Sequence, residues 1–132
     1  MAPRFDRSKC LDALEGVEWR EPTYPSYLIE TVHRLRKKPV HDFSIEDLRI
    51  VIGQSVGLPF LVPIALEQLE RDSLVQGDFY PGDLLVSVLS IARTYLVERP
   101  EDRPRLEALL AGMGDVDEHV EAAIGAYRRG AG

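Results

Sequence analysis

The fold is decided by residues 83–96, which read Asp83-Leu84-Leu85-Val86-Ser87-Val88-Leu89-Ser90-Ile91-Ala92-Arg93-Thr94-Tyr95-Leu96. Apolar side chains recur in this stretch at the i, i+3, i+4 and i+7 spacing of a helix face. These positions are Leu84, Leu85, Val88, Leu89, Ala92, Tyr95 and Leu96, and Val86 and Ile91 widen the stripe. A helix this apolar belongs at the centre of a core. Pro100 ends it.

Shorter helices are predicted on the N-terminal side, separated by prolines and glycines. They cover about residues 9–14, capped by Ser8, residues 26–37, capped by Ser26, and residues 44–53. Ser44-Ile45-Glu46-Asp47 resembles a capping box. A fourth helix follows Pro59 to about Arg71, and Pro63 either kinks it or delays its start. Residues 49–52 also suit a short buried strand, because β-branched side chains crowd them.

Two more helices are predicted on the C-terminal side, over about residues 102–128. The first covers residues 102–113. The second begins at Asp115-Val116-Asp117-Glu118, which resembles a capping box with aspartate as the cap. No segment alternates with period two, and the connections are short. The sequence therefore predicts an all-α fold, a compact bundle of six or seven helices forming one domain over residues 1–132.

The composition indicates a soluble protein of a reducing compartment. Of the 132 residues, 45% are hydrophobic, and Cys10 is the single cysteine, so no internal disulfide can form. The N-terminus lacks the apolar centre of a signal peptide. The longest apolar run, residues 58–66, has nine residues, two of them proline, and is too short to span a bilayer. We expect a cytoplasmic location and no membrane partner.

The net charge of −6 lies wholly in the C-terminal part. Residues 1–50 carry nine Lys/Arg and nine Asp/Glu, whereas residues 51–132 carry seven and thirteen. Such a field repels nucleic acid and attracts cationic partners. Modest negative charge also simply keeps a small protein soluble.

Gly53-Gln54-Ser55-Val56-Gly57 matches the G-x-S-x-G turn that presents a nucleophilic serine in α/β-hydrolases. Asp115 and His119 follow in the order that a serine triad requires. The motif has this meaning only between a strand and a helix of a large parallel sheet. In a helical chain, the two glycines more simply end one helix and open the turn into the next.

Metal and phosphate sites find little support. His33, His41 and His119 fall in no metal-binding spacing, and one cysteine cannot build a thiolate zinc site. Arg34, Arg36, Lys37 and Lys38 form a basic run, either a phosphate patch or cations that complement a helix C-terminus. We expect no metal and no cofactor.

A group of acids around one turn is the best candidate for partner binding. Glu67 and Glu70 share a helix face at i, i+3, and Asp78, Tyr80 and Asp83 lie in or beside the turn at residues 77–83. Aromatic side chains anchor interfaces and acids steer association. Solvated acids beside a helix start explain the same pattern without a partner.

A series of short motifs runs from residue 26 to residue 89. They are Ser26-Tyr27-Leu28, Leu35-Arg36-Lys37-Lys38-Pro39, Asp42-Phe43, Glu46-Asp47-Leu48-Arg49-Ile50, Ile52-Gly53-Gln54, Gly57-Leu58, Leu61-Val62-Pro63, Ala65-Leu66 and Gly77-Asp78-Phe79-Tyr80-Pro81-Gly82-Asp83-Leu84-Leu85. Together they resemble the immunity proteins of bacterial contact-dependent growth inhibition (CDI) systems. Residues 11–22, with Trp19 and Pro22, resemble that family more loosely, so the family-like block covers about residues 11–89.

The resemblance implies a cytoplasmic protein that is not an enzyme and that binds the C-terminal toxin domain of a large exported protein. That toxin is often a nuclease, and its cationic surface would suit an acidic inhibitor that works by stoichiometric occlusion. Two alternatives stay open: a small serine hydrolase using Ser55, Asp115 and His119, and a generic helical adaptor. The sequence leaves the oligomeric state open.

Overall fold

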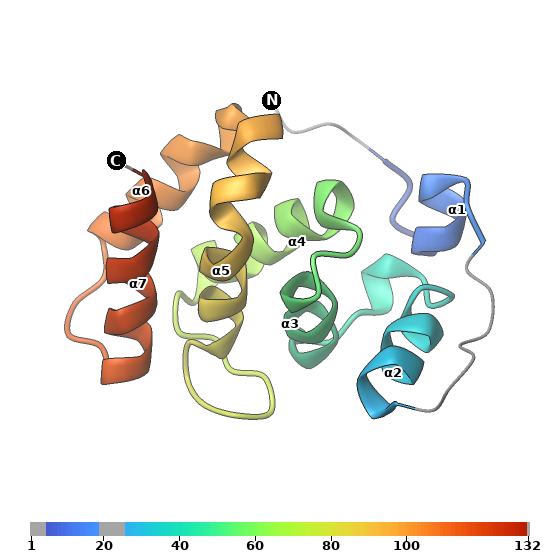
Figure 1. Ribbon diagram of the computed structural model, residues 1–132, viewed down its shortest axis with the longest axis horizontal. Helices are drawn as coiled ribbons and strands as arrows, with labels where there is room; N and C mark the ends of the chain where they lie inside the picture. The colour runs from blue at the N-terminus through green and yellow to red at the C-terminus, as the bar shows by residue number, and fades with distance from the viewer. Residues whose placement is uncertain (1–4, 19–25, 132) are drawn as a thin grey trace.

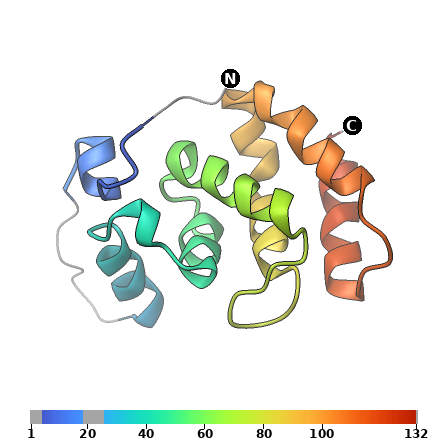
Figure 2. The ribbon, with the colours of Figure 1, turned by 180° about the vertical axis from the view of Figure 1, so that it is seen from behind.

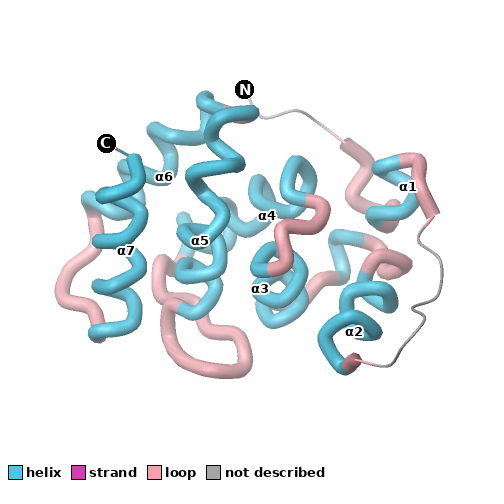
Figure 3. Tube along the Cα trace, in the orientation of Figure 1, coloured by secondary structure: helices cyan, strands magenta, loops and turns pink. Residues whose placement is uncertain are grey.

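The computed structural model describes residues 5–18 and 26–131, and in these ranges the regular structure is helical, with no named strand. The helices, shown in Figures 1 and 3, are α1 (Leu11–Glu15), α2 (Tyr27–Leu35), η1 (Val40–Asp42, a 3-10 helix), α3 (Ile45–Gly53), α4 (Leu58–Arg71), α5 (Asp83–Glu98), η2 (Pro100–Asp102, a 3-10 helix), α6 (Arg103–Ala111) and α7 (Glu118–Ala131). This confirms the all-α prediction. Residues 19–25, which include Trp19 and Pro22 of the family-like block, lie outside the described residues.

Helix α5 stands at the centre of the arrangement. It contacts α3, α4 and α7. Figure 1 shows α7 beside α5 at one end of the molecule, with α1 and α2 at the other end. Seen from behind, α4 crosses α3 and α5 (Figure 2). Helix α7, with 14 residues, therefore covers one side of α5.

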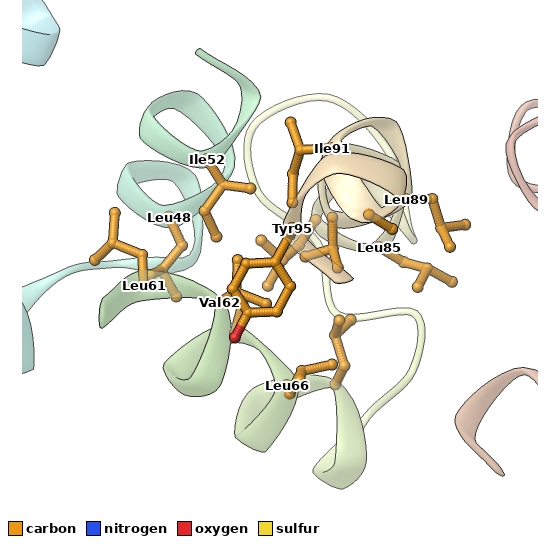
Figure 4. Packing of buried hydrophobic residues seen from close by; sticks show 14 of the residues in the cluster. Leu48, Ile52, Leu61, Val62, Leu66, Leu85, Leu89, Ile91 and Tyr95 are labelled. Carbon is orange, nitrogen blue, oxygen red and sulfur yellow. The ribbon is translucent and has the colours of Figure 1, made fainter. Parts of the chain in front are cut away.

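The apolar stripe predicted on α5 is buried. The buried side chains of this helix include Leu84, Leu85, Val88, Leu89, Ile91, Ala92, Tyr95 and Leu96. Figure 4 shows Ile91 and Tyr95 of α5 close to Ile52 of α3 and Val62 of α4, while Leu89 lies on the other side of α5. One cluster of buried residues includes members from α1 to α7. Burial of these side chains supplies most of the driving force for folding.

Helix α3 begins at the predicted capping box. The Asp47 amide donates to Ser44 Oγ at 3.0 Å, and the Ser44 amide donates to Asp47 Oδ2 at 3.0 Å. Residues 49–52 lie inside α3, so the alternative of a buried strand is wrong. The local cap determines the helix start and outweighs the β-branched side chains that follow it.

Three predicted helix ends differ from the structure. Ser8 does not cap α1, because its Oγ and amide both donate to Asp6, and the helix starts after Cys10. Helix α2 ends at Leu35 rather than near residue 37. Pro63 lies inside α4 and does not delay its start. It sits early in a buried helix, where tertiary packing offsets one missing hydrogen bond.

The predicted basic run braces the N-terminal helices. Arg36 is buried, and its guanidinium reaches Asp12 at 2.7 Å and Glu15 at 2.6 Å. Lys37 also reaches Asp12, at 3.1 Å, and Lys38 reaches Asp47 at 2.7 Å. Apart from Arg34, which is exposed, these cations serve the fold, which disfavours a phosphate patch.

A buried polar contact joins the end of α5 to the start of α6. The Tyr95 hydroxyl donates to Asp102, and both residues are buried. Burial, and then this hydrogen bond, raise the pKa of Tyr95. In the part of the chain that the structure describes, no helix is long and apolar enough to cross a bilayer.

Candidate functional site

The turn between α4 and α5, called here the 76–82 turn for its residues, folds around the carboxylate of Asp83. This carboxylate accepts hydrogen bonds from the amides of Gly77 at 2.6 Å, Phe79 at 3.0 Å and Tyr80 at 3.4 Å. Asp83 is only 3% exposed. We predicted a partner contact here, but the structure gives Asp83 an internal role, because its oxygens point at the main chain of the turn.

Glu46, on α3, holds the same turn from a second side. Its Oε1 accepts the Asp78 amide at 2.8 Å and Arg49 Nε at 2.7 Å. Hydrogen bonding to Arg49, with a smaller contribution from the Asp78 amide, holds the pKa of Glu46 below its usual value despite partial burial. Two carboxylates from different helices therefore define the path of one surface loop.

Glycine is required where the chain passes closest to these groups. A Cβ on Gly77 would lie 2.5 Å from Glu46 Oε1 and 3.2 Å from Asp83 Oδ2. Gly82 has a φ of 92°, and a Cβ there would lie 2.7 Å from Val120 of α7. Larger residues at these two positions would push the turn away from its anchors.

The anchored turn exposes Asp78 and Phe79. The Phe79 side chain is 66% exposed, and the Arg49 guanidinium carbon lies 4.3 Å from the centre of its ring. This cation–π contact orients the ring without covering it. Tyr80 is half-buried, and its ring centre lies 5.2 Å from that of His119. Burial, and then the nearby carboxylates of Asp83 and Asp117, raise the pKa of Tyr80.

Helix α7 supports the turn from behind. Val120 is fully buried against Gly82, and His119 lies against Tyr80. Asp117 is the cap of α7, because its Oδ1 accepts the Val120 amide at 3.0 Å. The predicted capping box would make Asp115 the cap, with Glu118 three residues later. The structure differs, because α7 begins at Glu118 and Asp117 is its cap.

Glu67 and Glu70 lie on α4 and are each paired with an arginine. Arg7 Nη1 reaches Glu67 at 2.8 Å, and Arg105 Nη2 reaches Glu70 at 2.8 Å. These hydrogen bonds lower the pKa of both carboxyl groups. Glu70 and Arg105 line an open depression of about 780 Å³ between the end of α4 and α6. The predicted acids thus form two groups, one on α4 and one in the turn.

Ser55 occupies a helix end and not a nucleophile elbow. It has a φ of 60°, and its amide donates to Ile52 O at 2.8 Å while the Val56 amide donates to Val51 O at 3.2 Å. This is the Schellman pattern that closes α3. The hydrolase alternative requires a strand before the serine, and α3 stands there. His119 lies against Tyr80 at the start of α7.

Within the described ranges, no group of three or more His, Cys, Asp or Glu residues is arranged to hold a metal ion. His33 Nδ1 lies 3.0 Å from the Ile29 carbonyl oxygen, and His41 Nε2 lies 3.4 Å from Asp42. Both contacts are local to their own segments.

Sequence reasoning found the turn but missed Glu46, Arg49 and Phe79 as parts of it. The position of Phe79 between Asp78 and Tyr80, in a turn expected at the surface, was the signal that could have found it. Glu46 and Arg49 form an i, i+3 pair on α3 that looks like ordinary helix surface. Only the fold brings them to this turn, since Glu46 and Asp78 are 32 residues apart along the chain.

The chain is thus an all-α, acidic protein with a surface turn that is anchored by carboxylates from two helices. A family model described as CDI immunity proteins matches residues 13–106. The chain therefore belongs to the CDI immunity protein family. The match runs from α1 to the start of α6, and α7 lies beyond it. No curated protein and no solved structure matches the chain.

Membership of this family implies a protein that binds a cognate toxin and protects against it. Proteins of this family are generally not enzymes. The match also includes the 53–57 serine motif and the whole of the 76–82 turn.

Proposed function

We propose that this protein neutralises its cognate toxin domain by stoichiometric occlusion. In this proposal it covers the cationic surface with which the toxin contacts the toxin's own target. Family membership supports the binding of a toxin, and the one observation that carries the mode of binding is the acidic charge around a rigid turn. A nuclease is the toxin that this charge fits best, because a nuclease must be cationic where it meets phosphates.

The acids proposed to face the toxin are Glu67 and Glu70 on α4 and Asp78 in the 76–82 turn. Tyr80, in the same turn as Asp78, is proposed to face it too. The Glu67 and Glu70 side chains are 39% and 44% exposed even while paired with arginines. Asp117 and Glu118 are also exposed, beside Tyr80 and His119. Asp83 and Glu46 act indirectly, by positioning the turn.

The charge of the C-terminal part also suits the place of action. The protein would meet the incoming toxin in the cytoplasm, where a cationic domain must be captured before it reaches nucleic acid. Long-range attraction raises association rates by steering the partners together. Residues 51–132 carry thirteen Asp or Glu residues and seven Lys or Arg residues. This net negative charge repels phosphate, so direct binding of nucleic acid by this protein is disfavoured.

The experiment begins with co-purification of the protein and the toxin domain encoded beside it, titration calorimetry and a protection assay. One-to-one binding that blocks toxicity is expected. Failure of the wild-type protein to bind that domain, or turnover of toxin by the protein, would contradict the proposal.

Association kinetics then test the surface. The triple variant Glu67→Gln, Glu70→Gln, Asp78→Asn should associate roughly tenfold more slowly at low salt, with a flatter salt dependence. The control Glu30→Gln, Glu98→Gln, Glu101→Gln removes the same charge at other exposed positions and should change the rate by less than about threefold. Equal slowing in both variants would show that net charge, and not this surface, steers the toxin.

A further inference from the structure

Resting on the proposed function, we propose that Phe79 is the apolar anchor of the complex: its ring inserts into an apolar pocket on the toxin domain whose rim is cationic. The ring would thereby set the dissociation rate, while the acids set the association rate. The carrying observation is an exposed aromatic ring at the tip of a turn whose backbone is fixed by two carboxylates.

The Phe79 ring makes none of the hydrogen bonds that hold the turn. The amide of Phe79, and not the ring, binds Asp83. The ring is 66% exposed and follows the exposed Asp78 in the chain. Aromatic side chains that can be buried at the centre of an interface carry a disproportionate share of binding energy.

The turn is already in a binding-competent shape. Asp83 and Glu46 hold the amides of residues 77–80, Arg49 backs one face of the ring, and α7 lies behind Gly82 and Tyr80. A side chain held in place before association loses little conformational freedom when it is buried. The second face of the ring is left for a partner.

The charges around Phe79 select the kind of partner. Negative side chains outnumber positive ones here. The carboxylates are those of Glu46, Asp78 and Asp83 around the turn and of Asp117 near Tyr80, and the guanidinium of Arg49 is the positive group among them. This excess of carboxylates fits a pocket bordered by Lys or Arg. A second copy of this chain would bring the same acidic turn, and like charges would repel it.

The test measures the kinetics of binding to the cognate toxin domain for the wild type, Phe79→Ala and a matched control, Val97→Ala. Val97 is also an exposed apolar residue, 76% exposed, and it lies near the far end of α5, about 20 Å along the helix from the turn. Phe79→Ala should raise the dissociation rate at least tenfold and change the association rate by less than about twofold. Val97→Ala should leave both rates unchanged.

Thermal unfolding of each variant separates loss of the anchor from loss of the fold. Phe79→Leu, which keeps an apolar side chain without an aromatic face, should give an intermediate dissociation rate and serves if Phe79→Ala does not fold. A dissociation rate within twofold of wild type for the folded variants would overturn the anchor but leave the proposed function standing. A wild-type protein that does not bind the toxin domain would overturn both.

Discussion

Replacement of Asp83 by alanine is the sharpest test of how the 76–82 turn is built. The change removes a carboxylate that is 3% exposed and that accepts three main-chain amides. It also removes a negative charge from the first turn of α5, where the helix dipole favours one. We expect a large loss of stability from a residue that contributes no apolar contact.

The magnitude follows from the hydrogen bonds. The bonds from Gly77 at 2.6 Å and Phe79 at 3.0 Å are short and charge-assisted, whereas the third, from Tyr80 at 3.4 Å, is weak. A hydrogen bond to a charged group contributes about 1.5–3 kcal/mol. Because the turn is at the surface, water replaces part of what is lost. We therefore expect the free energy of unfolding to fall by about 3 kcal/mol, which for a chain of this length lowers Tm by roughly 10 °C.

Urea denaturation followed by circular dichroism measures this loss, and an unchanged m-value would show that the compactness of the two states is the same. Asp78→Ala is the matched control, because Asp78 is in the same turn but is exposed. Its unfolding free energy should change by less than about 0.5 kcal/mol. The reasoning is refuted if Asp83→Ala loses less than about 1 kcal/mol, or no more than Asp78→Ala loses.

Two further predictions concern the helix end at Ser55 and the acid stability. Ser55→Gly should raise the free energy of unfolding by about 0.5–1 kcal/mol, because glycine adopts a φ of 60° without strain. Toxin binding should be unchanged. A loss of stability in urea denaturation would contradict the assignment of residues 51–56 as a Schellman motif. Glu46, Glu67 and Glu70 have folded-state pKa values below the usual 4.5. The unfolded chain therefore takes up protons first as the pH falls, so these groups stabilise the fold fully above about pH 4.5 and progressively less below it. Urea midpoints measured between pH 7 and pH 3 should fall in this window, less steeply for Glu46→Gln than for wild type, and parallel curves would rule out a contribution from Glu46.

Features written in neighbouring residues were predictable. The capping box at Ser44 and Asp47 depends on two residues three apart, and the stripe on α5 depends on spacing within one helix. Both are present as predicted. The errors of local reasoning arose where a competing local bond existed, as at Ser8, whose hydroxyl binds Asp6 and not the start of α1.

The anchoring of the turn was not predictable, because it depends on contacts distant in sequence. Asp83 was read as a surface acid, since nothing in residues 77–83 shows that its carboxylate turns inward. Glu67 and Glu70 were expected to share a helix face, but their pairing with Arg7 and Arg105, from segments 60 and 35 residues away, was not predicted. Pairing over such distances depends on how the helices pack. No periodicity in the sequence indicates it.

The two carboxylates that shape the 76–82 turn bind its main-chain amides. Every residue except proline offers such an amide. The side chains at positions 78 and 79 are therefore free to change without altering the course of the loop. A substitution at either position should therefore alter the surface that the tip presents while the main chain of the loop keeps its path.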